Sequence, residues 1–136
     1  MANGGIVEPP VIRPQYHFRR VGEDVHIWDV RGLIALADGL RVYDVPLRDI
    51  AEIDEPYWFD ATDGVASCRA VMDHAQHVAA ADLTYPVLLC AQGRVLDGMH
   101  RIMKAHGAGQ AAIVARRFVV TPPPDFVNQS PDDLSY

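Results

Sequence analysis

The segment Asp97-Gly98-Met99-His100-Arg101 combines the residue types best suited to holding an anion. An apolar strand, a glycine turn and a second short strand are expected before it, so Gly98 opens a helix. The N–H groups in the first turn of a helix are unpaired and carry partial positive charge. Gly98 admits a ligand close to the backbone. His100 adds a titratable hydrogen-bond donor, and Arg101 adds a planar, permanently charged guanidinium. The segment therefore predicts a phosphate-binding site.

The helix that Gly98 opens has one apolar face, which is expected to point into the core. Its members recur at spacings of three and four residues: Met99, Ile102, Met103 and His106. His100 and Arg101 fall off that face, so replacing both with alanine is expected to leave the fold intact. A second interpretation stays open, in which Asp97 is only a helix cap and His100 and Arg101 contact surface carboxylates.

Three acidic residues are candidates for catalysis. Glu52 and Glu55 lie in an acidic loop, and Asp97 adjoins the expected phosphate site. Phosphoryl transfer needs charge neutralisation and an oriented nucleophile, which carboxylates supply as Mg²⁺ ligands or as a general base. The alternatives are a solvated acidic loop for Glu52 and Glu55, and a capping role for Asp97.

Two further groups carry weaker signals. His74 and His77 share a helix face, which is ligand-compatible spacing, but no third ligand is evident and a solvent-facing pair is favoured. The aromatic run 57–59 is suited to base stacking, although packing at the rim of the core is favoured.

Composition limits the classes of protein and partner. The chain has 136 residues, enough for one domain with a real core. Its formal charge of −6 disfavours nucleic acid as a partner. Neither a signal peptide nor a membrane span is expected, and a cytoplasmic location is predicted. Cys68 and Cys90 are interpreted as small core residues.

The order of elements predicts a single mixed α+β domain. Residues 1–24 are interpreted as an irregular arm, 25–120 as the domain, and 121–136 as a surface tail that can engage a protein partner. A helix over 65–80 is expected, capped by Thr62 or Asp63, with an apolar stripe facing the core. That stripe comprises Val65, Cys68, Val71, Met72, Ala75, Val78 and Ala79.

The run 86–118 resembles the core of the ParB/sulfiredoxin superfamily, including small stand-alone ParB-like proteins. In that core, two strands lead to a Gly-x-His-Arg or Gly-Glu-Arg-Arg box at a helix start. The run 98–101 matches the sulfiredoxin box, Gly-Cys-His-Arg, at three of four positions. The resemblance extends from Arg41 to Phe118 and implies a short mixed sheet packed with helices.

The resemblance implies a nucleotide pocket. Sulfiredoxins hold ATP phosphates with this box, ParB partition proteins bind CTP with it, and an archaeal relative phosphorylates free serine. Gly98, Met99, His100 and Arg101 would then bind ATP, ADP or CTP, together with Mg²⁺. Met99 replaces the catalytic cysteine, so sulfiredoxin chemistry is excluded.

The leading hypothesis is thus a nucleotide-binding protein acting as a nucleotide-dependent phosphotransferase or hydrolase. The alternative is a non-catalytic nucleotide sensor or interaction module. A ParB-like nuclease or DNA-binding role is a weaker third reading, disfavoured by the acidic charge.

Overall fold

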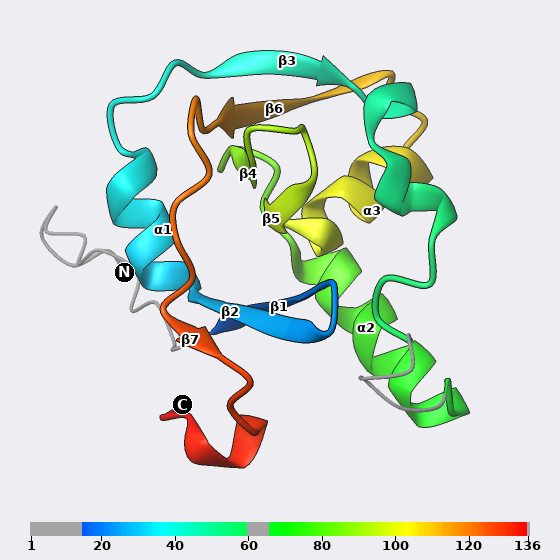
Figure 1. Ribbon diagram of the computed structural model, residues 1–136. Helices are drawn as coiled ribbons and strands as arrows, with labels where there is room; N and C mark the ends of the chain where they lie inside the picture. The colour runs from blue at the N-terminus through cyan, green and yellow to red at the C-terminus, as the bar shows by residue number, and fades with distance from the viewer. Residues whose placement is uncertain (1–14, 60–65, 136) are drawn as a thin grey trace, which may run out of the picture.

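A four-stranded sheet forms the centre of the computed structural model, which describes residues 15–59 and 66–135 (Figure 1). Its strand order is β3-β6-β4-β5, with β6 parallel to β4 and the other pairs antiparallel. The strands are β3 (Tyr43–Pro46), β4 (Val87–Leu89), β5 (Val95–Asp97) and β6 (Ala112–Arg117). Helix α3 (Met99–Gly107) makes the crossover between β5 and β6. The expected strand, glycine turn, strand and helix unit is confirmed, and the proline-containing strand β3 lies at the sheet edge as expected.

A second, three-stranded sheet lies beside the first. It is ordered β1-β2-β7 and consists of β1 (Tyr16–Val21), β2 (Asp24–Asp29) and β7 (Phe126–Val127). Helix α1 (Val30–Ala37) follows β2 directly. The irregular arm expected over 1–24 is wrong for 16–21, which pair antiparallel with β2. In the tail, β7 pairs with the other edge of β2.

The central strand β4 is buried on both faces, because alternate side chains of a strand point to opposite sides of a sheet. Val87 and Leu89 join a core cluster with Met99 and Ile102 of α3. Leu88 packs on the other side, in a cluster that includes residues of β2 and α1.

Cys90 is buried as expected, whereas Cys68 is exposed. Because both strands and helices build the core, the predicted mixed α+β class is confirmed.

Helix α2 (Cys68–Ala80) lies against α3 and contributes no fully buried residue. Its N-cap is Ser67, whose hydroxyl accepts from the Ala70 N–H; the expected start and caps at 62–65 lie outside the described residues. The predicted core stripe is wrong, since Val71 and Met72 are 49% and 57% exposed. The partly covered face carries Ala70, His74 and Val78, of which only Val78 belongs to the predicted stripe. None of the helices within the described ranges has the length and apolar character needed to cross a bilayer.

Candidate functional site

Gly98 is required at the start of α3 by both backbone conformation and packing. Its φ of +111° is rarely adopted by other residues. A Cβ at this position would lie 2.6 Å from the Val87 Cγ1 and 2.9 Å from the Val87 Cβ. Met99 is buried, as expected. Close contact with β4 therefore explains the glycine without a ligand.

Arg101 is engaged in a structural network. Its guanidinium donates to the carbonyls of Tyr85 and Pro86 at 2.9 and 2.8 Å, and to Asp97 Oδ2 at 2.7 Å. The side chains of Arg101 and Asp97 are each only 16% exposed. Arg101 thus ties α3 to the segment before β4. This network conflicts with the expectation that Arg101 is dispensable for the fold. Asp97 is not a helix cap either, because Gly98 is the N-cap of α3 and no side chain accepts a hydrogen bond there.

The face of α3 that packs on the core differs from the predicted face at one residue, His106. Ile102 and Ala105 are fully buried and Met103 partly buried, but His106 is exposed. The expectation that His106 faces the core is wrong, because the buried residue of the last turn is its neighbour Ala105.

His100 belongs to a cluster of aromatic and imidazole rings between α2 and α3. Its Nε2 lies 2.9 Å from the Nδ1 of His74, and the His77 ring lies 5.2 Å from the His100 ring. The indole of Trp58 stacks on both His74 and His100, with centroid distances of 4.3 and 4.7 Å. The two imidazole centroids are only 5.2 Å apart, too close for rings on opposite sides of the indole. They therefore lie edge to edge on one face of Trp58.

Burial keeps these imidazoles neutral. Desolvation, aided by the neighbouring His74, His77 and Arg101, lowers the pKa of His100 to about 4. The pKa of His74 is lowered mainly by desolvation as well. The solvent-facing His74/His77 pair expected from sequence is thus wrong for His74, which contacts a third histidine.

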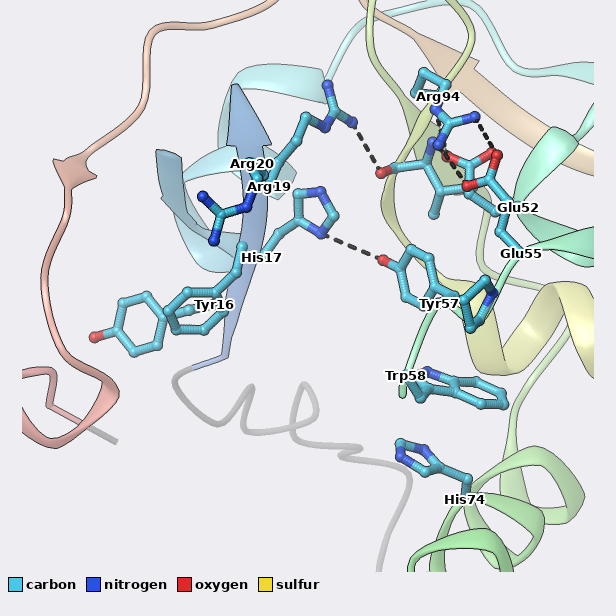
Figure 2. A pocket seen from close by; sticks show the side chains of 13 residues that line it. Tyr16, His17, Arg19, Arg20, Glu52, Glu55, Tyr57, Trp58, His74 and Arg94 are labelled. Atoms are coloured by element: carbon cyan, nitrogen blue, oxygen red, sulfur yellow. Dashed lines mark hydrogen bonds and ion pairs between the residues drawn. The ribbon is translucent and has the colours of Figure 1, made fainter. Parts of the chain in front are cut away.

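A cavity of about 580 Å³ opens beside this cluster. Figure 2 shows β1 on one side of it and the loop from Glu52 to Trp58 on the other, with His74 of α2 at one end. Arg94 and Val95, at the start of β5, complete the lining. Tyr57 and Trp58 both line the cavity and pack on the core, which confirms the expected rim packing. None of the residues 97–101 is among those lining the cavity.

The acidic candidates of the loop are held by Arg94. Glu55 forms a two-point ion pair with the Arg94 guanidinium at 2.6 and 2.9 Å, which lowers the Glu55 pKa. Glu52 is 3% exposed, accepts from the Val95 N–H at 2.6 Å, and lies 3.3 Å from Arg94 Nε. The other oxygen of Glu52, Oε1, is buried without a hydrogen-bond partner. Glu52 therefore fastens the loop to β5, and the expected solvated acidic loop is wrong for this residue.

His17 of β1 faces the loop across the cavity. Its Nδ1 lies 3.3 Å from the Tyr57 hydroxyl, and the rings stack with centroids 6.2 Å apart. Burial, assisted by the charge of Arg19, lowers the pKa of His17 to about 3. His17 is thus a neutral ring at physiological pH, and its Nε2 is buried without a hydrogen-bond partner.

Two adjacent arginines of β1 are among the lining residues, and Figure 2 shows that their guanidiniums point to opposite sides of the strand, with only that of Arg19 directed toward the loop. Arg19 donates to the Val95 carbonyl at 3.1 Å and lies 5.5 Å from the centre of the Trp28 ring. Arg20 is exposed. Within the described part of the chain neither guanidinium forms an ion pair with a carboxylate. The sequence shows this basic pair, but nothing local marks it as the wall of a cavity.

The residues that the sequence predicts to form one site therefore lie in two separate places. His100 reaches the cavity indirectly, through Trp58 and His74, while Arg101 and Asp97 pair with each other elsewhere. In residues 15–59 and 66–135, no three His, Cys, Asp or Glu side chains are already grouped to hold a metal ion.

Comparisons with protein-family models, with curated proteins and with solved structures find no match to this chain.

Proposed function

We propose that this protein binds a nucleotide, or another anion that joins a phosphate to a flat ring, in the cavity between β1 and the loop from Glu52 to Trp58. In this proposal the protein is a binding module without turnover. The observation that carries it is a cavity with aromatic rings on one wall and, on the other, the guanidinium of Arg19, which has no carboxylate partner among the described residues (Figure 2).

The size and charge of the cavity support an anionic small-molecule ligand. A volume of about 580 Å³ lies in the range typical of small-molecule sites. Arg94 is paired with both Glu52 and Glu55, whereas Arg19 has no carboxylate partner among the described residues. Guanidinium presents a planar set of donors that matches phosphate oxygens, so phosphate is the anion this wall suits best.

The aromatic wall supports a flat ring as the other half of the ligand. The imidazoles of His74 and His100 cover one face of Trp58, so the remaining indole surface is what this residue contributes to the cavity. Tyr57 stands edge-on to Trp58 with ring centroids 6.3 Å apart. Base stacking on such side chains contributes about 1–3 kcal/mol per base. A nucleotide with its base toward Trp58 and its phosphates toward Arg19 contacts both walls (Figure 2).

The state of the carboxylates favours binding over catalysis. Glu55 is paired with Arg94, Asp97 is paired with Arg101, and Glu52 is buried against the Val95 N–H. A general base or an Mg²⁺ ligand needs accessible lone pairs directed at the ligand. Glu55 and Asp97 use theirs to hold the loop and helix α3 in place, and the Glu52 oxygen that has no hydrogen-bond partner is buried. Any Mg²⁺ accompanying the nucleotide would then be held chiefly by the phosphates.

Calorimetric titration with ATP, ADP, CTP and GTP, each with and without Mg²⁺, tests the proposal. Arg19→Ala should weaken binding by roughly 10-fold or more, because a hydrogen bond to a charged group contributes about 1.5–3 kcal/mol. Arg48→Ala is the matched control, since it removes an exposed arginine outside the cavity. Equal affinities in both variants, or no heat with any nucleotide, would overturn the proposal. Phosphate release at a catalytic rate would overturn the absence of turnover.

A further inference from the structure

We propose that His74 and His100 form a two-histidine binding site for a divalent transition-metal ion such as Zn²⁺, Ni²⁺ or Cu²⁺. The proposal rests on the geometry of the two imidazoles and is independent of nucleotide binding. It assigns a ligand to the ring cluster between α2 and α3, which lies beside the cavity.

The two facing nitrogens are already close to the separation that a metal requires. His74 Nδ1 and His100 Nε2 lie 2.9 Å apart. Two nitrogens bound to one tetrahedral Zn²⁺ at 2.0–2.1 Å are separated by about 3.3 Å, so the nitrogens must part by about 0.4 Å and each ring must turn until both lone pairs point at the ion instead of at each other. A metal placed between them replaces the shared proton of the hydrogen bond. The donor ring moves that proton to its other nitrogen, and both rings remain neutral.

The surroundings hold both rings in this orientation. His74 projects from α2 and His100 from the first turn of α3, and both are pressed against the same face of Trp58. The edge of Phe59 packs on His74 at a centroid distance of 5.4 Å. Packing keeps the two rings adjacent and limits them to small movements away from the hydrogen-bonded arrangement, so they lose little freedom on binding a metal.

Imidazole nitrogen selects the class of ion. It suits Zn²⁺, Ni²⁺ and Cu²⁺, whereas Mg²⁺ prefers oxygen ligands. Because the described residues group no third His, Cys, Asp or Glu side chain with the pair, water fills the remaining positions. The site is therefore an open one, and for one geometry the affinities should follow the order Cu²⁺ above Ni²⁺ above Co²⁺.

Titration of the full chain with Zn²⁺, Ni²⁺ and Cu²⁺, without nucleotide, tests the proposal by calorimetry. His74→Ala and His100→Ala should each weaken binding at least about 10-fold, because loss of even an outer-shell partner costs that much. The matched control, His106→Ala, removes an exposed histidine of the same helix and should bind as wild type does. Circular dichroism establishes that each variant is folded, and His100→Asn replaces His100→Ala if the smaller residue unfolds the chain.

Fluorescence gives a second, local readout. Cu²⁺ bound between the two rings lies near the Trp58 indole and should quench its emission, whereas Trp28 belongs to a different core cluster. Trp58→Phe should keep the affinity for the ion and lose most of the quenching. Unchanged affinity in both histidine variants, quenching that persists in Trp58→Phe, or Mg²⁺ binding equal to that of Ni²⁺ would each overturn the site.

Discussion

Replacing Gly98 with alanine tests whether this glycine serves packing rather than a ligand. The new Cβ would lie 2.6 Å from Val87 Cγ1 and 2.9 Å from Val87 Cβ, and 3.1 Å from an Arg101 nitrogen. Real Cβ atoms do not approach other carbons so closely, so β4 and α3 must move apart. The φ of +111° adds strain that relaxation of the neighbours does not remove.

These two effects set the expected loss of stability. A positive φ costs a residue with a Cβ roughly 1–2 kcal/mol. Overpacking of a well-filled core typically costs about 1–3 kcal/mol. Gly98→Ala should therefore lower the free energy of unfolding by about 2–5 kcal/mol, a large part of the total stability of a small domain.

Urea unfolding followed by tryptophan fluorescence measures this loss. Gly107→Ala is the matched control, because a Cβ there meets nothing within 4 Å and the φ is ordinary; its effect should be neutral or stabilising by up to about 1 kcal/mol. In a Val87→Ala background the nearer clashing atom, Cγ1, is gone. Gly98→Ala should then cost less than in wild type, by about 0.5–3 kcal/mol. A fully stable Gly98→Ala variant, or an unchanged cost in that background, would refute the packing explanation.

Three further predictions concern titration and buried polar contacts. Because the pKa of His17 is lowered from 6.5 to about 3, its contribution to stability is complete above pH 6.5. That contribution is lost as the pH falls toward 3, by at most about 4 kcal/mol. Urea unfolding across this range measures the loss, and His17→Phe should flatten the dependence of the free energy of unfolding on pH. Glu52→Ala should lower the free energy of unfolding by about 1–3 kcal/mol, because it strips the buried Val95 N–H of its acceptor. Arg101→Ala should also destabilise the fold, by about 1–3 kcal/mol, since Asp97 and two carbonyls lose their donor.

Each of these has a result that contradicts it. Equal pH slopes in wild type and His17→Phe would show that His17 titrates normally in the folded state. A Glu52→Ala variant as stable as wild type would show that the loop is held by Arg94 alone. An Arg101→Ala variant with unchanged stability but weaker nucleotide binding would support the phosphate-binding role of Arg101 that the sequence predicts.

Local patterns sufficed for the elements whose partners are close in the chain. The buried run of β4, the glycine turn and the start of α3 at Gly98 were all expected, because capping and apolar spacing act over a few residues. β1 and β7 were missed. β7 has only two residues and pairs with β2 about 100 positions away, so no local pattern marks it.

The candidate site shows the same limit. The sequence marks Arg101 as a phosphate ligand, but the acceptors that occupy it include two backbone carbonyls that no residue pattern reveals. The spacing of His74 and His77 is visible, whereas the third imidazole comes from α3 through packing. Periodicity correctly marked an apolar stripe on α2, but the side of a helix that meets the core depends on its docking.

The most direct test of nucleotide binding in the cavity is an NMR titration that follows the two indole N–H signals as ATP is added. Trp58 lines the cavity, whereas the indole of the buried Trp28 donates to the Pro122 carbonyl at 2.9 Å and lies 5.5 Å from the Arg19 guanidinium, so it reports on that wall. Binding in the cavity predicts a saturable shift of the Trp58 signal together with the Arg19 amide, while the amide of Gly107, which is not among the lining residues, stays unchanged. Shifts confined to the amides of Met99 to Arg101, with Trp58 unmoved, would contradict it and return the phosphate to the start of α3.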